Sequence, residues 1–167
     1  MDTFAVSVVL DGIELDDDVL DTLFRDLPDA VPSHVNGVVT VSAPLEAADP
    51  EAAALQLIGR LRILLPAARP VRLDQDLVSV SDVAERTGRS RESVRLLVEG
   101  RRGPGGFPAP IGTVGDGIRV WPWAIVADWF RESLGQDLGE RGVPPGTAAR
   151  IDAALSNEHT APLGHVA

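Results

Sequence analysis

The first residues of the chain alternate between larger apolar and smaller side chains. Over residues 3–10, one side carries Phe4, Val6, Val8 and Leu10, and the other carries Ala5, Ser7 and Val9. A period of two with many β-branched residues is typical of a β-strand that is buried on one face. The pattern therefore predicts that the chain begins with a strand.

A helical period follows the turn at Asp11 and Gly12. Three aspartates at 16–18 suit the start of a helix, where carboxylates interact well with free backbone N–H groups. The apolar positions that follow share one helical stripe, namely Val19, Leu20, Leu23, Phe24 and Leu27. We expect a helix that ends at Pro28, and we explain the aspartates by this helix start rather than by a metal site or acid–base chemistry.

A hairpin and a second helix are predicted over residues 30–65. Asn36-Gly37 separates two extended stretches and is the preferred pair for a two-residue turn. Asp49-Pro50-Glu51 is typical of a helix N-terminus. The helix would bury Leu57, Ile58, Leu61, Leu64 and Leu65 and end at Pro66, before a last strand at residues 70–73.

The predicted order of elements in residues 1–75 is β-α-β-β-α-β, which is typical of the ferredoxin-like fold. Two helices cover only one face of such a sheet. On the first strand the other face carries Ala5, Ser7 and Val9, which are small and uncharged. Either a homodimer surface or a solvated face fits this composition.

The stretch from Ser79 to Gly100 has the pattern of a helix-turn-helix. Ser81 is positioned to cap a short helix over residues 82–87, with Val83 and Ala84 facing inward. Gly88 permits a tight, often left-handed turn. Ser90 would then cap a second helix over residues 91–100.

The second helix would turn its arginines outward. Its inner side carries Val94, Leu97 and Val98, whereas Arg91, Glu92, Arg95 and Glu99 lie outside and Arg89 lies at the turn. A helix in this position presents arginines to guanine edges in the major groove of DNA or to phosphates. The alternative is that these arginines pair with Glu92 and Glu99 on a solvated helix.

The pattern of residues 101–133 predicts a β-hairpin, which would form a wing, and a final helix. The basic pair Arg101-Arg102 precedes a Gly/Pro linker, and a hairpin turning at residues 115–117 follows, with Arg119 as a phosphate contact. A helix from about Pro122 would bury Ile125, Val126, Trp129 and Phe130. We interpret Trp121, Trp123, Trp129 and Phe130 as core residues rather than as a base-stacking platform.

Three motifs in this order, "LVSVSDVAERTGRSRESVRLLVEG", "GGFPAP" and "IRVWPWAIVADWF", resemble the winged helix-turn-helix domains of the MerR-like superfamily, especially its AlpA and excisionase branch. The resemblance covers about residues 76–133. It implies a DNA-binding role for Arg89, Ser90, Arg91, Ser93 and Arg95 on the recognition region and for Arg119 on the wing. It implies nothing about residues 1–75.

Charge is distributed unevenly along the chain. Residues 1–78 hold 14 acidic residues and five arginines, whereas residues 79–134 hold seven acidic residues and eight arginines. This asymmetry predicts an acidic module followed by a module with a basic edge. The 15 basic residues are all arginine, and the chain has no cysteine, so disulfides and thiolate chemistry are excluded. His34, His159 and His165 are too scattered to predict a metal site.

Together these patterns predict an α+β protein with three parts. They are a ferredoxin-like domain over 1–75, a winged helix-turn-helix domain over 76–134, and a linker with a short helical tail over 135–167, in which Ala148, Ile151 and Leu155 align and the last 11 residues are loose. No apolar run is long enough to span a membrane and no secretory signal is apparent, so we expect a cytoplasmic protein that requires no cofactor.

No enzyme motif is evident, since the chain lacks a phosphate-binding glycine loop and a nucleophile-elbow serine. The expected function is a transcriptional regulator that binds double-stranded DNA as a homodimer, through Arg101 and Arg102 as well as the residues above. One alternative is an excisionase-like architectural DNA factor. Another is an adaptor whose winged domain does not bind DNA and whose acidic N-terminal domain binds a protein partner.

Overall fold

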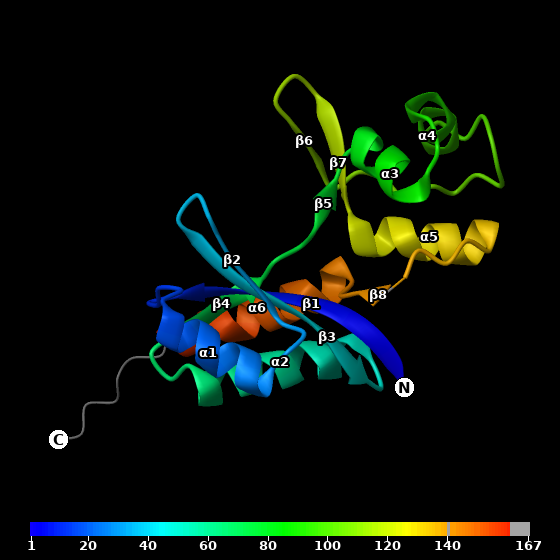
Figure 1. The fold of residues 1–167 in the computed structure, drawn as a ribbon. Coiled ribbons are helices and arrows are strands. Elements are labelled where there is room, and N and C mark those ends of the chain that lie inside the picture. Colours follow the sequence, from blue (N-terminus) through cyan, green and yellow to red (C-terminus); the bar gives the residue numbers. More distant parts are fainter. Residues whose placement is uncertain (140, 161–167) are drawn as a thin grey trace. The chain divides into compact units, whose positions relative to one another are not determined.

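The computed structural model describes residues 1–139 and 141–160, and the chain divides into two compact units (Figure 1). The N-terminal unit comprises Met1–Asp74 together with the described residues from Gly146 on, and the second unit is Gln75–Pro145. Within the described residues the chain is mixed α+β, with six helices and two small sheets, which confirms the predicted α+β class. None of the helices in this part of the chain is long and apolar enough to cross a membrane.

The N-terminal unit contains a strand, a helix, a hairpin, a second helix and a strand, followed much later by a third helix. In order these are β1 (Asp2–Asp11), α1 (Asp17–Asp26), β2 (Val31–Val35), β3 (Val38–Ala47), α2 (Pro50–Leu64), β4 (Arg69–Leu73) and α6 (Pro145–Thr160). Its strands pair antiparallel in the order β2-β3-β1-β4. The pairing of β1 with β4 shifts register between Val9 and Leu10.

The core of this unit lies between the sheet and its helices. Cross-strand partners on one face are buried together, with Phe4 opposite Leu45 and Val8 opposite Val41. Helix α2 packs on β1 and β3, and Figure 1 shows α1 and α2 on the same side of the sheet. The alternation seen in the sequence thus separates a core face from an outer face.

The predicted ends of these elements are largely confirmed. The Asp16 carboxylate accepts a hydrogen bond from the N–H of Val19, and the Asp49 carboxylate accepts one from Ala52. Asn36 and Gly37 both have positive φ, at 51° and 79°, as a two-residue hairpin turn requires.

Phe24, which the helical period places on the apolar stripe of α1, is not buried, because its side chain is 46% exposed. It lies about 100° around α1 from the buried Leu23, at the edge of the apolar stripe.

The outer face of the sheet is uncharged over much of its area. Ser7 and Ser42 lie opposite each other and their hydroxyls form a 2.6 Å hydrogen bond. Val31 and Val35 on the edge strand β2 are mostly exposed. The small residues predicted for this face are therefore present there.

Helix α6, which the sequence predicted as a short helix of the C-terminal tail, packs on the N-terminal unit. Ala148, Ile151 and Leu155 are buried, as their spacing predicted, because they face this unit. Two ion pairs join α6 to α2, one between Arg150 and Glu51 at 3.2 Å and one between Glu158 and Arg62. Residues 157–160, expected to be loose, continue the helix, whereas residues 161–167 with His165 lie outside the described residues.

The second unit is built from short elements around two tryptophans. These elements are β5 (Leu77–Val78), α3 (Val80–Thr87), α4 (Arg91–Val98), β6 (Gly112–Val114), β7 (Ile118–Pro122), α5 (Trp123–Leu134) and β8 (Arg141–Gly142). The strands β5, β7 and β6 pair in that order. The core contains Val78, Val83, Ala84, Val94, Leu97, Trp121, Val126, Trp129 and Phe130. The interpretation of Trp121, Trp129 and Phe130 as core residues is confirmed, whereas Trp123 is only partly buried.

The Gly/Pro segment after α4 is held against this core rather than being a free linker. The indole N–H of Trp121 donates to the carbonyl of Pro108 at 2.8 Å, and that of Trp129 donates to the carbonyl of Gly105 at 3.2 Å. Phe107 meets Trp121 edge-to-face with 5.7 Å between ring centroids. These contacts fix the path of the chain between α4 and β6 because buried indole N–H groups need acceptors.

Candidate nucleic-acid interface

Helix α3 begins with a reciprocal cap. Ser79 accepts a hydrogen bond from the N–H of Asp82, and the Asp82 carboxylate accepts from the N–H of Ser79 at 2.8 Å. The prediction that Ser81 is the cap is therefore wrong, since α3 starts two residues earlier than it implied. The spacing Ser-x-x-Asp at residues 79–82 is the sequence signal for this box. The backbone of Ser79 also holds the pKa of Asp82 below its usual value.

Gly88 ends α3 and turns the chain into α4. Its φ of 69° is left-handed, and its N–H donates to the carbonyl of Ala84. Such a conformation is costly for residues with a Cβ. Ser90 then caps α4 by accepting from the N–H of Ser93 at 3.1 Å. These two features match the predicted turn and the predicted second cap.

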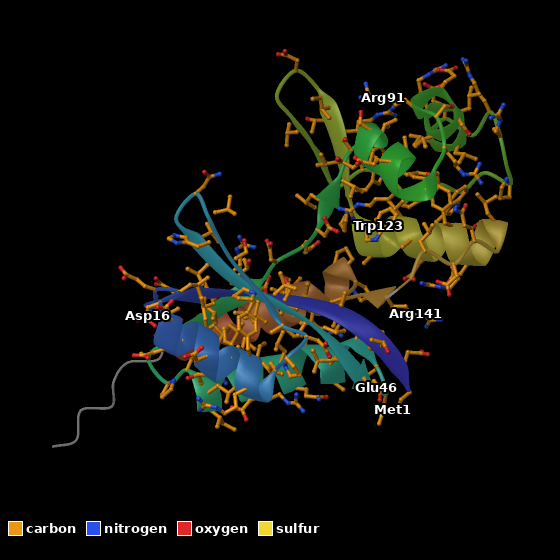
Figure 2. All side chains as sticks on the ribbon, viewed as in Figure 1. Met1, Asp16, Glu46, Arg91, Trp123 and Arg141 are labelled. Carbon is orange, nitrogen blue, oxygen red and sulfur yellow. The ribbon has the colours of Figure 1, made fainter. Side chains whose placement is uncertain are left out.

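The inner side of α4 packs in the core and its outer side carries charge. Val94 and Leu97 are fully buried, and Val98 is partly buried. Arg91 is the first residue of α4 and is exposed (Figure 2). Its guanidinium makes no hydrogen bond or ion pair within residues 1–139 and 141–160. Arg91 therefore offers a free cation at the N-terminal end of a helix.

Arg95, expected on the open outer face, is enclosed by two carboxylates. Its Nε and Nη2 donate to Glu92, at 2.9 and 2.5 Å, and its Nη1 donates to both oxygens of Glu99 at 2.9 Å. We call Glu92, Arg95 and Glu99 the carboxylate clamp. The hydrogen bonds that Arg95 donates to Glu92 and Glu99 raise the pKa of Arg95, and the Arg95 guanidinium lowers the pKa of Glu92. All three guanidinium nitrogens are thus engaged within α4 and its C-cap residue.

Arg89 also points into its own unit. Its Nη2 lies 3.4 Å from the side-chain oxygen of Gln136, and its guanidinium carbon lies 5.6 Å from the Phe130 ring centroid. Its Nε is buried and has no hydrogen-bond partner among the described residues. Gln136 follows α5, and no local spacing in the sequence links it to Arg89. Arg89, at the turn between α3 and α4, therefore packs against its own unit.

Two further arginines follow α4 directly. Arg101 and Arg102 are exposed, and the Nη1 of Arg102 donates to the hydroxyl of Ser93 at 3.2 Å. Arg101 lies 3.6 Å from a carboxylate oxygen of Glu99. The charges of both arginines reach Glu92 and help to lower its pKa. The basic pair predicted from the sequence therefore lies beside the first turn of α4.

Strands β6 and β7 form an antiparallel hairpin in the segment where the sequence predicted one. Val114 pairs with Ile118, and Thr113 with Arg119, so the two pairs lie on opposite faces of the hairpin. The Arg119 guanidinium lies 5.7 Å from the Trp121 ring centroid, on the face that leads into the core. Val114 and Ile118 are about half exposed. The hairpin has one face with an arginine and one with aliphatic side chains.

One anchoring cluster was not anticipated from the sequence. Arg86 on α3 donates to both carboxylate oxygens of Asp76, and its guanidinium lies 4.8 Å from the Trp123 ring centroid. The hydrogen bonds that Arg86 donates to Asp76 raise the pKa of Arg86. The backbone carbonyl of Asp76 also accepts from the N–H of Trp123 at 2.7 Å. This cluster fixes α3 against α5 and pairs the charge of Arg86 with that of Asp76.

The eight predicted site residues therefore separate into groups. Arg91, Arg101 and Arg102 are exposed around the start of α4, and the hydroxyls of Ser90 and Ser93 lie beside them. Arg95 is held in the carboxylate clamp, Arg89 faces inward, and Arg119 lies on the hairpin. The described residues contain no cluster of three His, Asp or Glu side chains that could hold a metal ion. Comparison of the chain with family models, curated proteins and solved structures gives no match.

Proposed function

We propose that Gln75–Pro145 is a winged helix-turn-helix domain of the MerR-like kind and that it binds double-stranded DNA. The order of α3, the Gly88 turn, α4 and the β6–β7 hairpin supports this proposal. In such a domain α4 would enter the major groove and the hairpin would lie along the adjacent backbone. The protein would act as a transcriptional regulator in the cytoplasm, without catalysis.

The observation that carries the proposal is the group of exposed arginines at the start of α4. Arg91 has no partner within the described part of the chain, and Arg101 and Arg102 lie beside the same turn. The N-terminus of a helix favours anions, and arginine binds phosphate and guanine through two parallel hydrogen bonds. A chain with formal net charge -10 has little other reason to gather exposed cations in one place.

The N-terminal unit is proposed to be a ferredoxin-like domain that pairs two subunits or binds a protein partner. Its β-α-β-β-α-β order and its strand order β2-β3-β1-β4 support the fold, and its uncharged outer sheet face supports the pairing. Pairing matters because one small domain makes few phosphate contacts. Two domains on two half-sites would supply the affinity that one domain lacks.

The test measures DNA binding by the purified protein, using the fluorescence anisotropy of a labelled mixed-sequence duplex over a range of salt concentrations. We expect salt-sensitive binding that Arg91→Ala/Arg102→Ala weakens by about tenfold or more, since two phosphate contacts are lost. The matched control is Arg25→Ala/Arg60→Ala, which removes two exposed arginines of the N-terminal unit. Equal losses in both variants would contradict the proposed interface, and no binding by the parent would contradict DNA binding.

Each alternative function has one observation in its favour. The exposed aliphatic pair Val114 and Ile118 on the hairpin favours an architectural factor, because apolar wedges unstack and bend DNA. A circular-permutation gel assay measures such a bend. The carboxylates beside Arg95 favour an adaptor that does not bind DNA, and the absence of binding in the anisotropy assay would support it.

A further inference from the structure

Two carboxylates, one on helix α4 and one on its C-cap residue, occupy an arginine of the same helix. Glu92 and Glu99 occupy every nitrogen of the Arg95 guanidinium from one turn before and one turn after it. Glu92 also lies within reach of the charges of Arg101 and Arg102. The outer side of the helix therefore carries two arginines, Arg91 and Arg95, and both nearby carboxylates pair with Arg95.

We propose that Glu92 and Glu99 compete with DNA phosphates for Arg95 and so lower the affinity of this surface for double-stranded DNA. This inference rests on the DNA-binding function proposed above. The carboxylate clamp is the regulatory element, and Arg91 and Arg102, which form no ion pair with Glu92 or Glu99, carry most of the remaining attraction.

The physical basis is an exchange of partners on the helix surface. A phosphate that approaches Arg95 replaces two carboxylates that already satisfy its hydrogen bonds, so the exchange gains little. The released carboxylates then face the polyanion at close range, where like charges repel. Their glutamine counterparts carry no such charge and leave Arg95 free for phosphate.

The experiment compares Glu92→Gln/Glu99→Gln with the matched control Glu85→Gln/Glu132→Gln. Glu85 on α3 and Glu132 on α5 are exposed and make no hydrogen bond or ion pair within the described residues. Both double variants change the net charge of the same unit equally. Each protein is titrated into a labelled mixed-sequence duplex at several salt concentrations, and circular dichroism checks that its helix content is parental.

We expect the clamp variant to bind about tenfold more tightly at low salt and its salt slope to steepen by about 0.9, the value of one added phosphate contact. The control should bind less than about twofold more tightly and keep the parental slope, because Glu85 and Glu132 hold no arginine of α4 that their replacement could release. Adding Arg95→Ala to the clamp variant should remove the extra slope. That triple variant identifies Arg95 as the group released.

The outcomes separate this inference from the proposed function. If the parent binds DNA and the clamp variant matches the control in affinity and slope, the carboxylates do not compete and the inference is wrong. If only the clamp variant binds, the parental surface does not bind DNA, so the proposed function is wrong and the inference that rests on it is wrong as well. If no protein in the set binds at low salt, the DNA-binding function is wrong and the inference is wrong with it.

Discussion

The carboxylate of Asp152 accepts a hydrogen bond from the backbone N–H of Leu73 at 2.7 Å, across 79 positions of the sequence. Leu73 is the last residue of β4, the strand at one end of the order β2-β3-β1-β4. A side chain of α6 thus satisfies a backbone donor of β4. This contact, with the ion pairs to α2, attaches α6 to the N-terminal unit.

We predict that Asp152→Ala lowers the free energy of unfolding of the N-terminal unit by about 1–2 kcal/mol, because a partly buried N–H loses its acceptor. Urea unfolding followed by circular dichroism measures the change. Asp152→Asn keeps an acceptor oxygen and should recover most of the loss. Equal losses in both variants would mean that charge, rather than the hydrogen bond, is what matters at this position.

The reciprocal cap of α3 should make stability depend on pH. The pKa of Asp82 is lowered in the folded protein, chiefly by the backbone of Ser79, so its contribution is present above its unfolded pKa of about 3.9 and is lost as the pH falls through the lower folded value. The difference in unfolding free energy between the parent and Asp82→Asn should therefore shrink as the pH is lowered from about 6 to about 3. A difference that is constant over this range would contradict the assignment.

Gly103 should tolerate substitution less well than a neighbouring glycine. Its φ is +73°, and a Cβ there would lie 3.0 Å from Leu97 on the inner side of α4. Gly106 has a similar φ of +71° but open space around it. We predict that Gly106→Ala costs about 1 kcal/mol of backbone strain and that Gly103→Ala costs roughly twice as much, measured by urea unfolding. Equal costs would show that Leu97 moves aside freely.

Replacing Arg89 should have little effect on the affinity of the protein for DNA. Its side chain lies against Phe130 with a buried Nε that lacks a partner in the described residues, and its hydrogen bond to Gln136 is long at 3.4 Å. Arg89→Leu therefore removes an unsatisfied group, loses one weak hydrogen bond and keeps the apolar packing. We expect unfolding free energy to be unchanged or slightly higher and DNA affinity to change less than about twofold, well below the effect of Arg91→Ala/Arg102→Ala. A tenfold loss of affinity would place Arg89 in the interface instead.

Local features of the sequence predicted local structure well. The caps at Asp16, Asp49 and Ser90, the Asn36-Gly37 turn and the left-handed Gly88 all depend on neighbouring residues, and all are present. The misplaced start of α3 had its own local signal, because Ser79 and Asp82 have the spacing of a capping box. Burial was predicted where the apolar period was clear.

Features that depend on distant partners could not be predicted in this way. The inward position of Arg89 depends on Gln136 and Phe130, and the fixed position of Arg86 depends on Asp76 and Trp123. The carboxylate clamp was different, since its i,i+3 and i,i+4 spacings were visible. Sequence alone left open whether Arg95 faces its glutamates or the solvent. In the structure Arg95 pairs with both Glu92 and Glu99.

The position of α6 has a consequence for synthesis of the protein. The N-terminal unit is discontinuous in sequence, because Gln75–Pro145 forms the second unit between its two parts. On a ribosome the second unit emerges whole, whereas the sheet emerges long before α6, whose Asp152 accepts a hydrogen bond from β4. Until residues 146–160 follow, the nascent sheet lacks the apolar cover of Ile151 and Leu155. The order of emergence thus favours folding of the second unit, Gln75–Pro145, before the N-terminal unit is complete.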